Sequence, residues 1–175
     1  MTTDAVTDED ERPQGYEDIL PVTTTEDLLC PANVVFYETW AALESGGQPS
    51  ARHAADLVAA ENVHDVAVVV EVLEDGADFL IADLGPALLR LDPLLRAGLR
   101  ISHRPDLIVK RRTLYLLRMT VCSRAPWYSR PGYSYFQGRE HLRIESVALP
   151  FFGPDGAVCL IIGRYDLVPA GTETA

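Results

Sequence analysis

The sequence has no apolar run long enough for a membrane-spanning helix. Such a helix needs roughly 18 to 20 uninterrupted apolar residues, and no stretch of the chain approaches that length. The first residues, MTTDAVTDEDER, are acidic, whereas a secretion signal begins with basic residues and continues with an apolar segment. These two absences predict a cytoplasmic protein with no membrane partner.

Cysteine is scarce, and its placement argues against cross-linking. Cys30, Cys122 and Cys159 are odd in number and widely spaced, so the sequence predicts neither a disulfide framework nor a zinc motif. All three lie in apolar runs. We therefore expect small buried side chains rather than redox-active thiols.

Motifs for nucleophilic catalysis and phosphate binding are missing as well. No Gly-x-Ser-x-Gly turn presents a serine nucleophile. The pair Gly46-Gly47 follows a helical pattern, which makes it a helix stop rather than a phosphate-binding loop. We expect no catalytic residues, and therefore no enzyme.

Cofactor signatures are equally sparse. A flavin photosensor that forms a thiol adduct would need an Asn-Cys-Arg-Phe type sequence, which is absent. Haem would need a histidine on or beside residues 106–125; only His103 lies near, and a loop position explains it better than axial ligation. His53, His64 and His141 are too scattered in sequence to predict a metal site, although folding can gather distant residues. The sequence leaves the cofactor unknown and predicts no metal.

The net charge of -11 is concentrated at the N-terminus. Residues 1–27 hold nine acidic side chains against one basic side chain, and so carry eight of the eleven excess negative charges. The rest of the chain has seventeen acids and fourteen bases, a balance that argues against the clustered positive charge of phosphate-binding proteins. Nucleic acid is therefore not an expected partner.

The ends of the chain differ in composition from its middle. Residues 1–23 combine acids, threonine and proline with few apolar side chains, which predicts a disordered acidic leader. Residues 24–45 predict an N-terminal flanking helix, in which Pro31 separates a short turn from the main helix. Residues 46–168 are the expected folded domain, and residues 169–175 are an expected flexible tail.

One side of the flanking helix is apolar. Val35, Tyr37, Trp40 and Leu43 leave a face that can dock either on the body of the protein or on a second copy of the chain. We expect this face to form an interface, and the protein to be a homodimer.

Two hairpins predict an antiparallel sheet. The valine-rich run of residues 66–73 and the run of residues 79–84 are typical of strands, and a Glu-Asp-Gly turn joins them. Residues 143–152 and 157–168 predict a second pair of strands, joined at Pro154-Asp155-Gly156.

Residues 107–125, between the hairpins, predict a long amphipathic helix. Basic residues flank its apolar stripe: Lys110, Arg111, Arg112, Arg118 and Arg124. They favour a solvated helix face, but they can also meet an anionic partner or the acidic leader of the same chain. After the helix come Trp127, Tyr128, Tyr133, Tyr135 and Phe136. Alternate packing along a strand explains this cluster best, and the lining of a pocket or partner groove is the alternative.

This order of elements predicts an α+β fold. A sheet built from the early and late hairpins leaves a face for the long helix and the short helices to cover. A five-stranded antiparallel sheet is the natural solution, because strands from both halves of the chain must pair.

The opening segment FYETWAALESGGQPSARHAAD and the closing segment RIESVALPFFGPDGAVCLIIG resemble PAS domains. Within them, the chain is most similar to the PAS_5-like group of single-domain proteins common in alphaproteobacteria. The likeness covers about residues 33–166. It implies a PAS-like five-stranded antiparallel sheet with helices on one face and an N-terminal helix. It often implies a small-molecule pocket between the sheet and the long helix, and it implies no reaction.

On this resemblance, the expected function is a sensory or signalling module without its own output domain, in which ligand binding changes a protein–protein contact. The partner would be a histidine kinase or another regulator. The expected ligand pocket is lined by Leu117, Val121, Val147, Leu149 and Ile161. The alternative is a small α+β enzyme with an active site assembled only in the fold, and two facing ionisable groups in a buried pocket would favour it.

Overall fold

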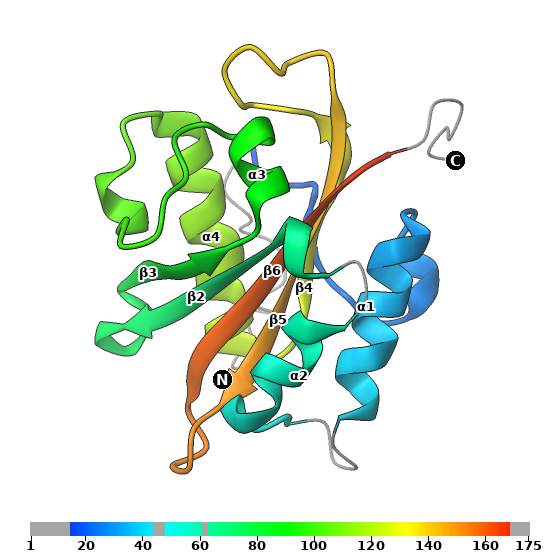
Figure 1. Cartoon of the computed structure of the whole chain (residues 1–175), viewed down its shortest axis with the longest axis vertical. Helices are drawn as coiled ribbons and strands as arrows, with labels where there is room; N and C mark the ends of the chain where they lie inside the picture. The colour runs from blue at the N-terminus through cyan, green and yellow to red at the C-terminus, as the bar shows by residue number, and fades with distance from the viewer. Residues whose placement is uncertain (1–14, 44–47, 61–62, 169–175) are drawn as a thin grey trace, which may run out of the picture.

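Strands from both halves of the chain form one antiparallel sheet. The structure is a computed structural model that describes residues 15–43, 48–60 and 63–168. Within these residues, six strands pair in the order β1-β4-β5-β6-β2-β3 (Figure 1). The strands are β1 (Ile19–Pro21), β2 (Ala67–Leu73), β3 (Asp78–Leu84), β4 (Trp127–Tyr133), β5 (Arg143–Phe152) and β6 (Val158–Leu167). The predicted α+β class and both predicted hairpins are confirmed. The expected number of five strands is wrong, because β1 pairs with β4 and adds a sixth described strand at the edge.

Four α-helices and several short 3-10 turns connect the described strands. The helices are α1 (Pro31–Ala42), α2 (Ala54–Ala59), α3 (Pro86–Leu91) and α4 (Leu107–Ser123). The 3-10 turns include η1 (Thr25–Asp27), η3 (His64–Val66) and η5 (Ile101–His103). The expected long helix is therefore present as α4. As expected, Pro31 separates the short turn η1 from the main helix α1, and it occupies the first turn of that helix.

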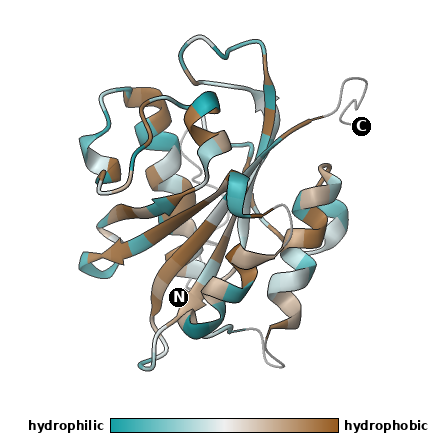
Figure 2. Ribbon diagram, in the orientation of Figure 1, coloured by the Kyte–Doolittle hydropathy of each residue, from teal (hydrophilic) through white to brown (hydrophobic). Residues whose placement is uncertain are grey.

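Helices cover both faces of the sheet, so the expectation of helices on one face is wrong. Successive side chains of β5 point to opposite faces. Val147, Leu149 and Phe151 belong to a core cluster with α1 and α2, whereas Ala148 and Phe152 belong to a cluster with α4. Figure 1 shows α1 and α2 on one side of the sheet and α4 on the other. The apolar central strands in Figure 2 fit a sheet buried on both sides.

A buried carboxylate fastens the beginning of α1 to the sheet. Glu145 of β5 is fully buried and accepts hydrogen bonds from the backbone N–H of Leu29 (2.7 Å) and Cys30 (3.0 Å). It also accepts one from the side-chain amide of Asn33 (2.9 Å). A negative charge at this end of a helix complements the helix dipole. Burial, reinforced by the charge of Glu145, raises the pKa of the Cys30 thiol to about 12.

The segment expected to be a separable flanking helix is instead part of the core. Phe36 and Trp40 of α1 are 1% and 5% exposed, and the indole N–H of Trp40 donates to the carbonyl of Pro150 (2.8 Å). Tyr37 and Leu43 are partly buried against the same cluster, and Val35 is the exposed residue of this group at 60%. The sequence allowed this helix to dock either on the body of the protein or on a second copy. In the structure it docks on the body.

The predicted leader is too long. Residues 1–14 lie outside the described part of the chain, but Ile19 is 1% exposed and β1 pairs with β4. Tyr16 also stacks on Tyr115 of α4, with ring centroids 4.7 Å apart. The acidic composition of residues 1–23 hid this short strand, because only a few apolar side chains dock it.

An ion-pair network fixes the loop that leads into α4. Arg104 is 3% exposed, and its guanidinium donates to the carboxylates of Asp92 (2.8 Å) and Asp106 (2.7 Å). Burial alone would lower the pKa of Arg104, but these hydrogen bonds outweigh it and hold the pKa raised. Asp106 precedes α4 directly, so the network sets where that helix starts.

One close backbone approach and the exposure of the cysteines refine the sequence-based picture. A Cβ at Gly85 would lie 2.1 Å from the carbonyl oxygen of His64, so glycine is needed for that close approach. Cys30 is buried as expected, whereas Cys122 and Cys159 are exposed, which corrects the prediction for these two residues.

We expect the substitution Glu145→Ala to lower the free energy of unfolding by about 3 kcal/mol, because three donors, two of them buried, lose their acceptor. Urea denaturation followed by circular dichroism measures the change. Glu71→Ala is the matched control, since Glu71 is exposed on the nearby strand β2 and should change stability by less than about 0.5 kcal/mol. Equal effects of the two substitutions would contradict the anchoring role of Glu145.

Candidate functional site

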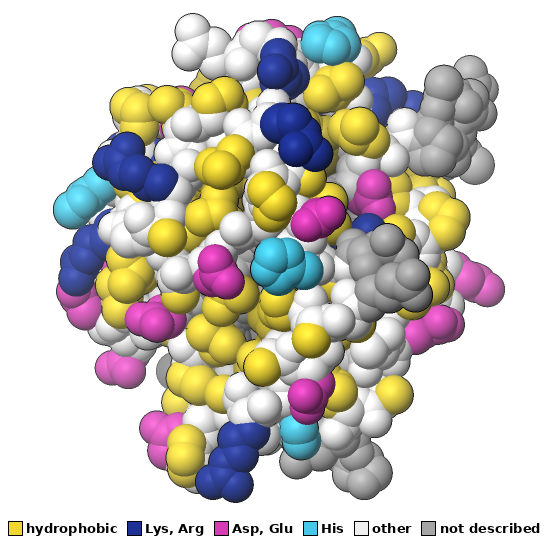
Figure 3. Space-filling model, viewed as in Figure 1, with side chains coloured by type: hydrophobic (Ala, Val, Ile, Leu, Met, Phe, Trp, Pro, Cys, Tyr) yellow, Lys and Arg dark blue, Asp and Glu magenta, His cyan; other side chains and the backbone are white. Residues whose placement is uncertain are grey.

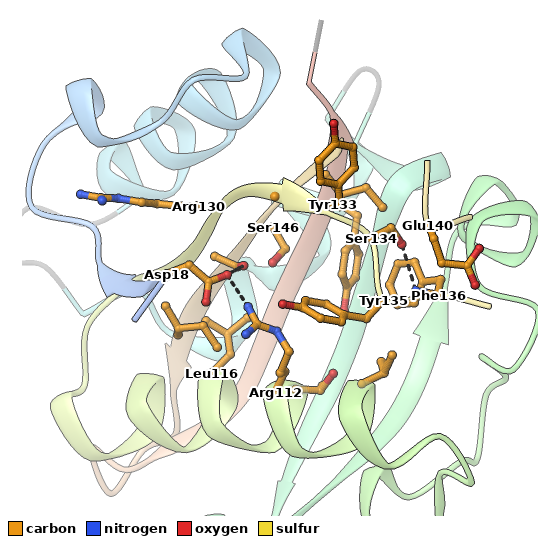
Figure 4. A pocket seen from close by; sticks show the side chains of 17 residues that line it. Asp18, Arg112, Leu116, Arg130, Tyr133, Ser134, Tyr135, Phe136, Glu140 and Ser146 are labelled. Atoms are coloured by element: carbon orange, nitrogen blue, oxygen red, sulfur yellow. Dashed lines mark hydrogen bonds and ion pairs between the residues drawn. The ribbon is translucent and has the colours of Figure 1, made fainter. Parts of the chain in front are cut away.

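A cavity of about 370 Å³ lies between α4 and the β1, β4 and β5 strands (Figure 4). Its volume is at the lower end of the roughly 300 to 1,000 Å³ typical of small-molecule sites. Its walls come from five elements, α4, β1, β4, β5 and β6, and from the β4–β5 connection. The lining residues are Asp18, Ile19, Val109, Arg112, Thr113, Leu116, Ser129, Arg130, Gly132, Tyr133, Ser134, Tyr135, Phe136, Glu140, Ile144, Ser146 and Tyr165.

The sheet wall of the cavity belongs to the face that carries α4. Ile19 pairs with Ser129, and Gly132 pairs with Ile144, so the two positions of each pair lie on the same face of the sheet. Glycine at position 132 leaves space there, because the nearest heavy atom to a Cβ built on it is 3.8 Å away. The floor is therefore mainly apolar, with an open position at Gly132.

Arg112 of α4 is the cation at the inner wall. One guanidinium nitrogen pairs with the carboxylate of Asp18, and another donates to the carbonyl oxygen of Gly15. The guanidinium also lies over the ring of Tyr135, 4.6 Å from its centroid. Asp18 accepts a further hydrogen bond from Ser129 (3.3 Å). These contacts hold Arg112 in one orientation and tie the N-terminal segment to α4.

The connection between β4 and β5 closes the opposite end of the cavity. Ser134 accepts a hydrogen bond from the backbone N–H of Phe136 (3.0 Å), and Phe136 packs edge-to-face with Tyr165 at 6.0 Å. Hydrogen bonds from the backbone N–H of Glu140 and Gly138 lower the pKa of the Glu140 carboxyl, so it stays charged at neutral pH. This end of the cavity carries negative charge, and the α4 end carries the Arg112–Asp18 pair.

A much smaller cavity of about 30 Å³ lies under the middle of α4, where the predicted pocket was expected. Leu117 and Val147 line it, whereas Val121, Leu149 and Ile161 line neither of the two cavities. The five predicted residues do not surround one pocket, because Val147 and Leu149 pack on the face that carries α1.

The other candidate residues from the sequence do not join either cavity. His103 is exposed in η5, and His53, His64 and His141 lie apart from it. Among the described residues, no cluster of histidine, cysteine and acidic side chains has the arrangement of a metal site. In the same residues, no helix combines the length and apolarity needed to cross a bilayer.

Part of this site corresponds to interpretations that the sequence left open. Tyr133, Tyr135 and Phe136 line the cavity, as the pocket interpretation of the aromatic cluster allowed. Arg112 meets an acidic residue of the N-terminal segment, as the second interpretation of the basic residues allowed. Asp18 was missed, because one acid among nine in residues 1–27 carries no distinguishing signal.

Charge on the visible surface is mixed. On the face seen in Figure 3, acidic and basic side chains are interspersed rather than gathered into one positive field. This face therefore offers no basic patch of the kind that binds phosphates. The absence of a nucleic-acid partner stays a prediction.

Comparison with known proteins gives limited similarity. No protein-family model matches the chain, and no curated protein matches it. A solved structure described as an RNA-binding light-oxygen-voltage receptor is similar with 19% identity and a TM-score of 0.48. The match covers 86% of this chain and 38% of the receptor chain. The RNA binding in this description is a property of that receptor. Within the described residues, the chain forms one antiparallel sheet with a long helix packed on one of its faces.

Tyr165 connects both cavities, and its ionisation offers a test of their burial. Burial raises the pKa of the Tyr165 phenol to about 12 from 10.0, with Arg104 opposing the shift. Because the folded-state pKa is the higher one, the neutral phenol stabilises the fold fully below about pH 10. That stabilisation is lost as the pH rises from 10 to 12.

We therefore expect phenolate absorbance of the unaltered protein to contain a late-ionising component that is lost in Tyr165→Phe. The unfolding free energy of the unaltered protein should also fall more steeply with alkaline pH than that of the variant. Tyr133→Phe is the control, since this ring is 71% exposed and its removal should leave the late component in place. A late component that survives Tyr165→Phe would contradict the burial of this phenol.

Proposed function

We propose that the chain is a PAS-like sensory module that binds a small organic molecule in the 370 Å³ cavity beside α4. Binding there changes the contacts that fasten the N-terminal segment to α4 and the sheet, and thereby alters a contact with another protein. The observation that carries this proposal is that the N-terminal segment forms part of the cavity wall. Asp18 and Ile19, from the N-terminal segment, line the same space as residues of α4, β4 and β5.

The wall residues give the cavity the character of a binding site rather than of a packing gap. Side chains such as Val109, Leu116 and Ile144 give the cavity its apolar surface, and polar side chains from α4, the strands and the β4–β5 connection line it as well. Recognition sites for small molecules usually combine an apolar body with a few oriented polar groups. A molecule of suitable size would bury apolar surface there and gain orientation from Arg112.

The N-terminal segment is suited to respond, because it is short and lies at the margin of the sheet. Strand β1 is three residues long and lies at the edge of the sheet. Besides the pairing of β1 with β4, the stacking of Tyr16 on Tyr115 and the buried side chain of Ile19 hold this segment. Arg112 and Ser129 add hydrogen bonds to Gly15 and Asp18. Elements with few buried contacts are those that open at low free-energy cost.

A shift of β1 would have a direct consequence for protein contacts. Strand β4 pairs with β1 on one side and β5 on the other, so displacement of β1 would expose backbone donors and acceptors of β4. An exposed strand edge pairs readily with another chain. The homodimer and the histidine kinase or other regulator expected from the sequence are candidate partners for this edge.

The competing hypothesis is a small enzyme. Its required feature is a pair of facing ionisable groups available for proton transfer. Arg112 and Asp18 face each other in the cavity, but they are paired with each other, and Glu140 is bound by its own loop. The described lining holds neither histidine nor cysteine. These occupied groups favour binding over catalysis.

N-phenyl-1-naphthylamine, a neutral aromatic dye whose fluorescence rises in apolar surroundings, tests the cavity directly. We expect one dye molecule to bind per chain, and the substitution Gly132→Trp to abolish binding by filling the open position on the sheet wall. Gly132→Ala is the matched control and should retain binding, because a methyl group fits there. Thermal unfolding of each variant checks the fold.

Unchanged dye binding in Gly132→Trp would place the dye elsewhere and remove the support for this cavity. Absence of binding in the unaltered protein would contradict the proposed sensory site itself.

A further inference from the structure

The partners of Arg112 are unequal in burial. The Arg112 side chain is 13% exposed, whereas that of its partner Asp18 is 36% exposed. Arg112 is carried by the 17-residue helix α4, and Asp18 immediately precedes the three-residue edge strand β1. The cation is therefore the fixed member of the pair, and the carboxylate is the replaceable one.

The contacts made by Arg112 are those that a bound anion would make. Its guanidinium binds a carboxylate and a carbonyl oxygen, both supplied by residues 15–18 of the same chain. Stacking on Tyr135 keeps the guanidinium plane in place without using its N–H donors. A partly buried cation that lost Asp18 without a replacement would be left desolvated and unpaired, so its release requires another anion.

The other charged groups of the cavity do not take over this role. Glu140 lies at the opposite end and accepts a hydrogen bond from the backbone N–H of Gly138 (2.9 Å). In Figure 4 the side chain of Arg130 extends away from the cavity, whereas Arg112 points between Asp18 and Tyr135. Arg112 is thus the cation that an occupant of the cavity would meet.

Building on the proposed sensory site, we infer that its ligand is an apolar, ring-containing organic anion of the carboxylate type. The anion replaces Asp18 and the Gly15 carbonyl on Arg112, while the ring system lies on the apolar floor. Asp18 acts as the internal occupant of the anion subsite when the ligand is absent. Displacement of residues 15–18 then weakens the pairing of β1 with β4.

Two dyes that differ by one charged group separate the anion subsite from the apolar floor. The dye 8-anilino-1-naphthalenesulfonate has the ring skeleton of N-phenyl-1-naphthylamine plus a sulfonate, which stands in for the ligand carboxylate. We expect the sulfonated dye to bind more tightly than the neutral dye. Arg112→Gln should reduce this preference by at least about threefold, while Arg111→Gln, at the neighbouring exposed position, should leave it unchanged.

Asp18→Asn tests the competition. Removing the internal carboxylate should strengthen binding of the sulfonated dye by at least about threefold and leave the neutral dye nearly unaffected. A merely structural role for Asp18 would instead weaken the two dyes alike, and that result would overturn the inference.

Hydrogen exchange reports the displacement of β1. The backbone N–H of Arg130 donates to the carbonyl of Asp18 (2.7 Å), so its exchange should accelerate when the sulfonated dye binds and stay unchanged with the neutral dye. If both dyes bind equally well in the unaltered protein and in Arg112→Gln, the anion subsite is refuted and the sensory cavity stands. If neither dye binds, the cavity proposal fails together with the inference.

Discussion

The account rests on the ion pair between Arg112 and Asp18, because it joins the longest helix to the segment that precedes the sheet. The pair lies where α4, β1 and β4 meet, and it forms one wall of the larger cavity. Its environment is only partly shielded from water, so its contribution to stability is modest compared with that of the apolar core. The Arg112–Asp18 pair therefore has a defined geometry but contributes little free energy, so a bound ligand can replace it.

The remainder of the fold provides a rigid frame around this adjustable contact. On one face, Glu145 and Trp40 fasten α1 to the central strands through buried hydrogen bonds. On the other face, Arg104 and its two aspartates set the start of α4. These buried polar groups make their bonds within the frame, whereas the pair at Arg112 lies at its margin. The structure therefore combines two firmly held faces with one loosely held edge strand.

Sequence patterns identified the elements whose local signals are strong. Valine density and an Asp-Gly turn predicted β2 and β3, and the periodicity of α4 was readable in the same way. The two faces of β5 were not separated, because a continuous apolar run such as VALPFF hides which alternate residues meet α1 and which meet α4. Cavity residues were harder still, since Asp18 and Arg112 are 94 positions apart and become neighbours only through the fold.

A crystal structure of the protein with 8-anilino-1-naphthalenesulfonate tests the central claim most directly. The account predicts the dye in the larger cavity, with its sulfonate on Arg112, its rings against Leu116 and Ile144, and Asp18 moved off the guanidinium. Dye density elsewhere on the protein, with the Arg112–Asp18 pair intact, would contradict the account.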